Sequence, residues 1–402
     1  MRILYVSDVY FPRVNGVSTS IRTFRAELGR LGHETALVAP CYPAGDTGEA
    51  GIHRIESRSV PLDREDRAMR WSELRALDRA LAAERFDLVH IQTPFLAHYA
   101  GLAFARAWGV PAIATYHTLF EEYLFHYVPF APEATMRALA RRFSRGQCNA
   151  LDRVVVPSTP MHQALLRYGV AAPIEIVPTG LRFEELRGGD GARFRAAHGI
   201  APNRPVLAFV GRVAFEKNID FLLRMLVNVR REVPDVLLVV TGEGPAEASL
   251  KRLAKALQLD DNVRFLGYLD RATALLDCYR GADAFVFASR TETQGLVLLE
   301  AMALGTPVVA LAVMGTRDIL REGRGALIAP DDEREFAARV VALLSDRELS
   351  AALSAAAVEY AREWGAAEMA RRLCGVYERV TAARACGERS TESQPLASPA
   401  GD

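Results

Sequence analysis

The sequence lacks the markers of several common protein classes. Its five cysteines among 402 residues form no CxxC pair and no zinc-binding spacing with histidine, which favours a reduced, cytosolic protein without structural zinc. No run reaches the roughly 18 apolar residues that a membrane-spanning helix needs, and the first residues turn polar too early for a signal peptide. Lysine plus arginine equal aspartate plus glutamate at 49 each, so net charge gives no reason to expect a nucleic-acid partner. Any membrane contact is therefore expected to be peripheral.

Two short motifs are also missing. No Gly-x-Gly-x-x-Gly follows the first predicted strand, residues 3–6, which argues against a nicotinamide-binding domain. No Asp-x-Asp is present either, so a metal ion is not expected beside a bound diphosphate. We therefore predict no metal site and no cofactor other than a substrate.

Apolar runs alternate with helical patterns through most of the chain, which predicts an α/β protein with parallel sheets. Half of the residues are hydrophobic, so a large core is available. Residues 64–86 are predicted to form one long charged helix. The glycine-rich segment 187–191 is predicted to be a linker, with the domain boundary between about 184 and 203. The first predicted strand of the first half is residues 3–6, and the others are 35–38, 52–55, 88–91, 112–115, 154–156 and 174–177.

The most informative stretch runs from residue 284 to residue 309. A buried strand, 284–288, precedes a polar loop, and a helical pattern then runs from about Gln294 until glycine and proline end it. Ligands gather at the carboxyl ends of parallel strands, and a helix N-terminus there favours phosphate. Glu292 and Glu300 would repel phosphate and are better suited to hydroxyl groups. A sugar nucleotide carries both kinds of group, although two acids on a solvated helix face would give the same letters.

A second loop carries the positive charge that such a ligand needs. The predicted strand 206–210 ends in a loop that contains Arg212 and Lys217. Two cations at a helix N-terminus would neutralise charge on a diphosphate leaving group as the glycosyl bond breaks. A salt-bridged loop without a ligand is the alternative.

These motifs resemble retaining glycosyltransferase family 4. The resemblance rests on Glu292 and Glu300 separated by seven residues, on the following Ala-Met-Ala-x-Gly-x-Pro-Val-Val, and on Gly-Arg-x4-Lys ending at Lys217. It covers the chain to about residue 383 and implies the GT-B fold, with two Rossmann-like doubly wound domains around a cleft. The implied domains are 1–183 for the acceptor, with a helix at about 359–384 packing back on it, and 203–357 for the nucleotide-sugar donor. Apart from the resemblance, the Ser, Thr, Pro, Gly and charged residues of 385–402 predict a disordered tail.

The resemblance also implies roles for individual residues. Arg212 and Lys217 would bind the donor diphosphate, Glu292 the sugar hydroxyls and Glu300 the ribose. Gly16 would approach the diphosphate, although a glycine in Asn15-Gly16-Val17 can be a plain turn. His117 would contact the transferred sugar, although a lone histidine at a strand end is most often structural. The implied catalytic group is Arg212, Lys217, Glu292 and His117, and the implied donor-binding positions are Gly16, Arg212, Lys217, Leu269, Gln294, Gly295, Leu296 and Glu300.

Two features of the first half point toward a lipid. The segment 119–127 is rich in aromatic residues, which suits core packing, an acceptor pocket or a membrane-facing loop. The predicted helix 136–148 contains no acid and carries Arg137, Arg141, Arg142 and Arg145, so it is either a solvated face or a surface for anionic lipid.

The resemblance implies a retaining, metal-independent hexosyltransferase. Glucose from UDP-glucose is the first choice of donor and diacylglycerol the first choice of acceptor, since the aromatic segment and Thr-Glu-Thr-Gln-Gly-Leu most resemble the branch that glycosylates such lipids. The expected location is the cytoplasm, including the inner face of the cell membrane if the basic helix binds lipid. A GDP-mannose-dependent mannosyltransferase, a sugar-nucleotide epimerase and a sugar-nucleotide-binding protein remain as alternatives.

Overall fold

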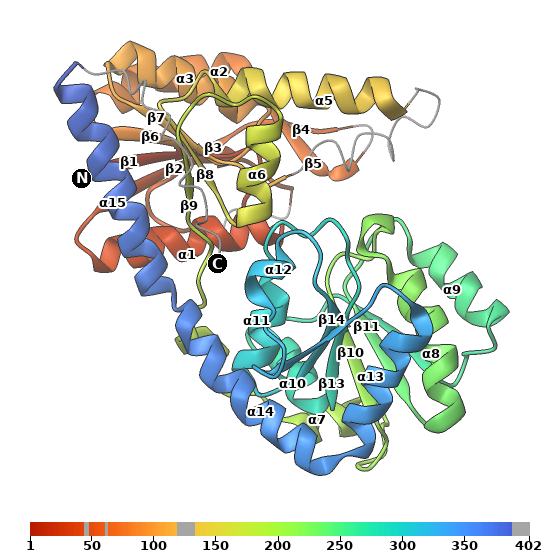
Figure 1. The fold of residues 1–402 in the computed structure, drawn as a ribbon. Helices are drawn as coiled ribbons and strands as arrows, with labels where there is room; N and C mark the ends of the chain where they lie inside the picture. The colour runs from red at the N-terminus through yellow and green to blue at the C-terminus, as the bar shows by residue number, and fades with distance from the viewer. Residues whose placement is uncertain (44–47, 61–62, 119–132, 388–402) are drawn as a thin grey trace, which may run out of the picture. The chain divides into compact units, whose positions relative to one another are not determined.

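The chain folds into two compact units, each built around its own parallel sheet (Figure 1). The computed structural model describes residues 1–43, 48–60, 63–118 and 133–387. The first unit contains Met1–Thr179 together with the chain from Ala367 onward, and the second contains Gly180–Ala366. This architecture confirms the predicted α/β fold class with two Rossmann-like domains.

The first unit has a seven-stranded sheet in the order β3-β2-β1-β6-β7-β8-β9, with parallel neighbours throughout. Helices α2 and α3 lie on one face of the sheet, and α1 and α15 lie on the other (Figure 1). The elements of this unit are β1 (Arg2–Val6), α1 (Gly16–Arg30), β2 (Glu34–Pro40), β3 (Ile52–Ile55), β4 (Ser57–Val60), β5 (Asp63–Met69), α2 (Trp71–Ala82), β6 (Leu88–Ile91), α3 (Leu96–Trp108), β7 (Ala112–Thr115), α5 (Glu133–Cys148), β8 (Arg153–Val156), α6 (Thr159–Arg167), β9 (Ile174–Ile176) and α15 (Ala366–Ala385).

The second unit has a six-stranded parallel sheet in the order β12-β11-β10-β13-β14-β15. Its elements are η2 (Phe183–Leu186), α7 (Gly191–Ala197), β10 (Val206–Val210), η3 (Phe215–Lys217), α8 (Ile219–Glu232), β11 (Leu237–Thr241), α9 (Glu247–Ala256), β12 (Val263–Gly267), α10 (Ala274–Gly281), β13 (Ala284–Phe287), α11 (Leu296–Ala303), β14 (Val308–Leu311), α12 (Thr316–Ile319), β15 (Ala326–Ala329), α13 (Glu333–Ser345), α14 (Arg347–Ala361) and η4 (Arg362–Trp364).

Both sheets reverse their strand order next to the first strand. In the second unit the chain builds β10, β11 and β12 outward in one direction, and then returns to place β13 on the other side of β10. In the first unit the same reversal lies between β1 and β6. Ligands of doubly wound folds bind outside the carboxyl ends of the strands at this switch point. The loops after β1 and β6, and after β10 and β13, are therefore the places to look for a site.

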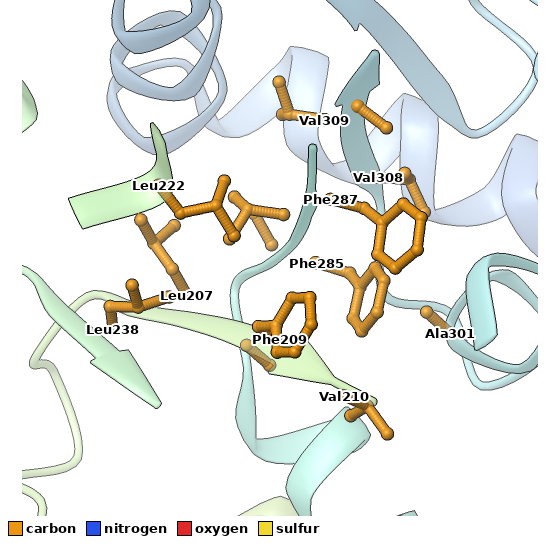
Figure 2. Packing of buried hydrophobic residues seen from close by; sticks show 14 of the residues in the cluster. Leu207, Phe209, Val210, Leu222, Leu238, Phe285, Phe287, Ala301, Val308 and Val309 are labelled. Carbon is orange, nitrogen blue, oxygen red and sulfur yellow. The ribbon is translucent and has the colours of Figure 1, made fainter. Parts of the chain in front are cut away.

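The core of the second unit holds β10 and β13 rigidly side by side. All residues of both strands are buried, as expected for parallel strands covered on both faces. The Phe209 and Phe287 rings stack with centroids 5.9 Å apart, and Phe285 and Phe287 lie 6.2 Å apart (Figure 2). Aromatic packing of this kind adds about 0.5–1.5 kcal/mol per pair beyond the burial of area. The loops that follow these two strands are therefore anchored to the buried core.

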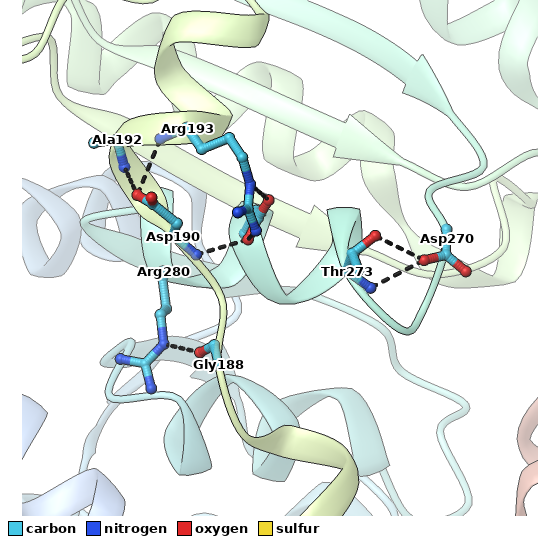
Figure 3. Close-up of polar contacts among 8 residues, drawn as sticks. Gly188, Asp190, Ala192, Arg193, Asp270, Thr273 and Arg280 are labelled. Atoms are coloured by element: carbon cyan, nitrogen blue, oxygen red, sulfur yellow. Dashed lines mark hydrogen bonds and ion pairs between the residues drawn. The ribbon is translucent and has the colours of Figure 1, made fainter.

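The glycine-rich segment is not the linker that the sequence predicts. The chain passes between the units at residues 179–180 and 366–367 instead. Gly188 accepts a hydrogen bond from Arg280 Nε, and the Asp190 amide donates to Asp277 Oδ1 at 2.6 Å (Figure 3). A Cβ at Gly191 would lie 2.4 Å from the Arg280 carbonyl oxygen. Gly189 and Gly191 therefore permit close packing against α10, and the segment is not a flexible hinge.

Two predicted helices also differ from the structure. Residues 64–86 form β5, which pairs antiparallel with β4, and then the shorter α2. The predicted helix 359–384 is interrupted by η4 and by Gly365, where Leu181 pairs with the returning chain. The Leu181 amide donates to the Trp364 carbonyl at 2.7 Å and the Ala366 amide to the Leu181 carbonyl at 2.9 Å. This short parallel bridge requires extended backbone, which a continuous helix cannot supply.

Helix α15 nevertheless belongs to the first unit. Tyr377 is fully buried, and its hydroxyl lies 2.8 Å from the Tyr5 hydroxyl on β1 and 2.7 Å from His90 Nδ1 on β6. His90 Nε2 lies 2.8 Å from the Thr115 hydroxyl at the end of β7. One buried polar network therefore joins the returning helix to three strands. The predicted disordered tail, apart from residues 385–387, lies outside the described residues.

Candidate functional site

Two of the predicted charged residues of the second unit, Lys217 and Glu292, meet at the switch point of its sheet. Arg212 and Lys217 follow β10, and Glu292 follows β13, the strand that pairs with β10. Three side chain-to-backbone hydrogen bonds tie the two loops together. Asn218 Nδ2 donates to the Ala288 carbonyl at 3.0 Å, and the Ser289 and Thr291 hydroxyls donate to the Glu216 carbonyl at 3.3 and 3.4 Å. Asn218 adopts φ 56°, in the left-handed region that asparagine tolerates, just before α8 begins.

Lys217 and Glu292 form an ion pair across these loops. Lys217 Nζ lies 2.6 Å from Glu292 Oε2, and the two side chains are 15% and 20% exposed. The salt-bridged loop considered from sequence is therefore present, but it joins two of the predicted site residues to each other. An ammonium group and a carboxylate at the carboxyl edge of a sheet offer a donor for phosphate oxygens and an acceptor for hydroxyl groups.

Helix α11 begins beside this ion pair. Gly295 precedes it with φ 99°, a conformation that favours glycine, and Leu296 is the first helical residue. The first amides of a helix have no partners within it and attract anions. Gln294 is buried and Leu296 half-buried. The structure thus places the predicted positions Gln294, Gly295 and Leu296 at a helix N-terminus next to Lys217.

The loop after β14 holds the backbone of Glu292 in place, and the sequence analysis did not predict this contact. The Gly315 amide donates to the Glu292 carbonyl at 2.8 Å. A Cβ on Gly315 would lie 2.0 Å from the Thr293 carbonyl oxygen, so only glycine fits. The available signal was a glycine soon after a predicted strand at the same edge of the sheet.

Glu300 lies apart from this group, four residues into α11, and has partners of its own. Its side chain is 6% exposed, it forms an ion pair with Arg271, and it accepts a hydrogen bond of 3.0 Å from the Tyr279 hydroxyl. The nearby carboxylate raises the pKa of Arg271, and burial raises the pKa of Tyr279, so both side chains stay protonated donors. Neither was predicted to be a site residue. Leu269, the predicted base contact, lies half-buried in the loop after β12, two residues before Arg271.

Gly16, one of the predicted residues of the first unit, lies in the region after β1, at the switch point of its own sheet. Gly16 begins α1 after β1, and the Asn15 side chain caps the helix by accepting from the Ser18 amide at 2.8 Å. Nothing lies within 4 Å of a Cβ built at Gly16, so this residue is not packed against another segment. The role of Gly16 at a diphosphate stays a prediction.

His117 follows β7 and contacts the end of the neighbouring strand β6. Its Nε2 lies 3.0 Å from Gln92 Oε1. Burial lowers the pKa of His117 to about 4, so the ring is neutral at pH 7. A neutral imidazole that donates from Nε2 keeps Nδ1 as an acceptor for a hydroxyl group. His117 is therefore suited to hydrogen bonding and unsuited to act as a cation, and its contact with a sugar stays a prediction.

The basic helix predicted at 136–148 is the larger part of α5. Arg137, Arg141, Arg142 and Arg145 line a hollow beside Tyr168, whose ring lies 5.7 Å from the Arg141 guanidinium carbon. Leu139 and Phe143 are exposed on the same helix, at 56% and 37%. Helix α5 thus carries four arginines and, separately from the hollow that they line, two exposed apolar side chains. The aromatic segment 119–127 lies outside the described residues.

The described part of the chain contains neither a membrane-spanning helix nor a metal-binding cluster. No helix there is long and apolar enough to cross a membrane. No group of three or more His, Cys, Asp or Glu residues there is placed to hold a metal ion.

Comparisons with known proteins agree with this geometry. A family model described as Glycosyltransferase Family 4 matches residues 14–185, and one described as Glycosyl transferases group 1 matches residues 190–364. Among solved structures, sucrose-phosphate synthase from Thermosynechococcus elongatus superposes with a TM-score of 0.76 at 22% identity, covering 95% of this chain and all of that one. Anabaena Alr3699/HepE in complex with UDP-glucose also gives 0.76, at 17% identity, covering 94% of this chain and all of that one. At these identities the structural likeness shows a shared GT-B fold.

Two curated relatives are closer in sequence. The alpha-monoglucosyldiacylglycerol synthase of Streptococcus pneumoniae is 34% identical over 77% of this chain and 71% of its own length. The GDP-mannose-dependent alpha-mannosyltransferase of Mycobacterium tuberculosis is 31% identical over 98% of this chain and 99% of its own. Together with the two family models, these similarities establish that the chain belongs to glycosyltransferase family 4.

Proposed function

We propose that this glycosyltransferase moves a hexose from a nucleoside diphosphate sugar to a lipid acceptor, with retention of the anomeric configuration and without a metal ion. The observation that carries the proposal is the Lys217–Glu292 ion pair at the start of α11, where a cation, a carboxylate and a helix N-terminus converge. A sugar diphosphate needs these three groups together. The likeness to the alpha-monoglucosyldiacylglycerol synthase favours glucose as the sugar and diacylglycerol as the acceptor.

Donor binding would separate the ion pair. The Lys217 ammonium would turn to the diphosphate, and Glu292 would then accept hydrogen bonds from the sugar hydroxyls. As the bond between the anomeric carbon and the phosphate oxygen breaks, its electron pair moves to the diphosphate, and Lys217, Arg212 and the α11 amides offset that charge. The acceptor hydroxyl attacks from the same face, and its proton passes to the departing phosphate oxygen. Because cations and amides of the protein supply the positive charge, turnover is expected in EDTA.

A mannosyltransferase is the second candidate, because the GDP-mannose-dependent relative matches nearly the whole chain. A donor screen separates the two. The protein would be mixed with UDP-glucose, UDP-galactose, UDP-N-acetylglucosamine or GDP-mannose, in EDTA, with or without diacylglycerol vesicles, and nucleotide release would be followed. Release that depends on lipid and on one UDP-sugar supports the first candidate, and release from GDP-mannose supports the second. No release from any donor, with or without lipid, would contradict the proposal.

The basic surface of α5 is proposed to hold the enzyme on anionic membranes. Each basic residue near such a surface contributes about 1 kcal/mol, and exposed Leu139 and Phe143 can enter the lipid boundary. Changing Arg141, Arg142 and Arg145 to Glu should abolish sedimentation with phosphatidylglycerol vesicles. The matched control changes the exposed Arg231, Arg252 and Arg347 of the second unit to Glu, which alters net charge equally. Equal loss in both triple variants would reduce the effect to net charge and contradict a dedicated surface.

A further inference from the structure

Arg271 reaches Glu300 from a loop that is itself fixed in place. It follows β12 at the carboxyl edge of the sheet, where ligands of this fold bind. The preceding residue, Asp270, accepts hydrogen bonds of 2.9 Å from both the amide and the hydroxyl of Thr273, at the start of α10 (Figure 3). The Leu275 amide also donates to the Asp270 carbonyl at 2.8 Å. The backbone beside Arg271 is therefore tied to the start of α10.

Tyr279 approaches the same carboxylate from α10. It is fully buried, its ring lies 5.7 Å from that of Phe285, and its carbonyl accepts a 2.6 Å hydrogen bond from the Thr306 hydroxyl. Its own hydroxyl donates to Glu300 Oε2, whereas Arg271 pairs with Oε1. Each oxygen of Glu300 thus has one protein donor from a different element.

This arrangement leaves half of the carboxylate's bonding capacity unused by these two partners. A carboxylate offers about four lone-pair sites, two on each oxygen. Arg271 and Tyr279 take one on each oxygen, so one site on each remains. A pair of neighbouring hydroxyl groups, as on the 2′ and 3′ carbons of ribose, presents two donors at a matching separation. Arg271 remains 26% exposed beside Glu300, so the carboxylate lies at the edge of the core.

We propose that Arg271 and Tyr279 are positioning residues that hold Glu300 as an oriented anion for the ribose diol of the nucleotide. Arg271 supplies the counter-charge that a desolvated carboxylate requires, and Tyr279 fixes the rotation of the carboxylate. Arg271 then controls recognition of the sugar hydroxyls of the nucleoside without touching the transferred hexose. The inference rests on the proposed function, because it assumes a nucleoside diphosphate at this edge of the second unit.

The test compares nucleotides with and without the two hydroxyls. Affinities for UDP and 2′,3′-dideoxy-UDP, and for GDP and 2′,3′-dideoxy-GDP, would be measured by calorimetry. For the better-bound nucleotide, the wild type should prefer the ribose form by about tenfold or more, as expected for hydrogen bonds to a charged acceptor. Arg271→Met should bring that ratio close to one while leaving the dideoxy affinity within about twofold of wild type. A merely structural role would weaken both ligands equally.

Three further variants complete the design. Arg271→Lys, which keeps the charge and loses the planar fork, should give an intermediate ratio, and Tyr279→Phe should lower the ratio less than Arg271→Met does. Arg224→Met, which removes an arginine paired with Asp220 and Glu333 on an exposed face, should leave the ratio unchanged. If Arg271→Met does not fold, the Lys and Phe variants decide the question.

The outcomes separate this inference from the function on which it rests. An unchanged ratio in Arg271→Met, or tighter binding of UDP or GDP by that variant, would overturn the inference alone. A wild-type ratio near one would overturn it too, by removing the ribose contact at Glu300. If neither UDP nor GDP binds the wild type, the proposed function fails, and the inference fails with it.

Discussion

Neutralising both members of the Lys217–Glu292 ion pair should restore stability without restoring activity. The two side chains are 15% and 20% exposed, so the pair lies between a surface pair and a buried one. Removing one partner of a buried pair costs about 3–5 kcal/mol, and exposed pairs contribute about 0–1 kcal/mol. We therefore expect Lys217→Met and Glu292→Gln each to lose about 1–3 kcal/mol of unfolding free energy, because each leaves a partly desolvated charge behind.

The double variant removes both charges and should return to within about 1 kcal/mol of wild type. Its rate of nucleotide release should nevertheless stay about 100-fold or more below wild type, since one fixed donor to a developing anion contributes on that scale. Urea denaturation measures the first quantity, and initial rates with the active donor measure the second. A double variant that regains both stability and activity would show that the pair is structural, and would refute its assignment to the donor site.

Three other perturbations follow from buried contacts. Acidification from pH 7 to pH 5 should destabilise the first unit, because burial lowers the pKa of His98 to about 4 and that of His90 well below 6.5. Unfolding exposes both rings to protonation near pH 6.5, so stability is lost as the pH falls below that value, by about 2 kcal/mol for His98 at pH 5. His98→Gln should therefore make the urea midpoint depend less on pH. Gly315→Ala should lower kcat/KM by displacing the Thr293 carbonyl, which its Cβ would approach to 2.0 Å. Steady-state kinetics measure this loss, and a thermal melting scan checks that the variant is folded. Tyr377→Phe should cost about 1–3 kcal/mol by leaving buried polar partners unsatisfied, and hydrogen exchange in α15 should accelerate.

The sequence predicted the two sheets well because their strands are short apolar runs bounded by loops. The positions of Lys217, Glu292 and Gly295 at the ends of strands were predictable too, because each residue lies in the loop after such an apolar run. The order of the strands in the sheet could not be predicted from the sequence pattern, and this order makes β10 and β13 neighbours. The meeting of Lys217 with Glu292, 75 residues apart, could therefore be expected only from the family resemblance.

The errors have physical causes as well. The glycines of the segment 187–191 predict a flexible linker from sequence, whereas in the structure Gly189 and Gly191 allow close approach to Leu276 and Arg280. The charged segment 64–86 predicts a helix from its sequence pattern. Its first part is instead a strand, β5, because it pairs with the separate short strand β4, which the sequence analysis did not predict. Arg271 and Tyr279 carry no local motif, and their meeting at Glu300 depends on how α10 packs beside α11. Tertiary contacts of this kind have no signal in a single sequence.

The most direct test of the central claim is the structure of the product. The protein would be incubated with diacylglycerol vesicles and the donor identified by the screen, and the lipid fraction would be examined by mass spectrometry and proton NMR. The proposed retaining transfer predicts one hexose per lipid, joined through an α-anomeric bond when the donor is an α-linked sugar nucleotide. A β-linked glycolipid would contradict the retaining mechanism, and free hexose without glycolipid would contradict the lipid acceptor.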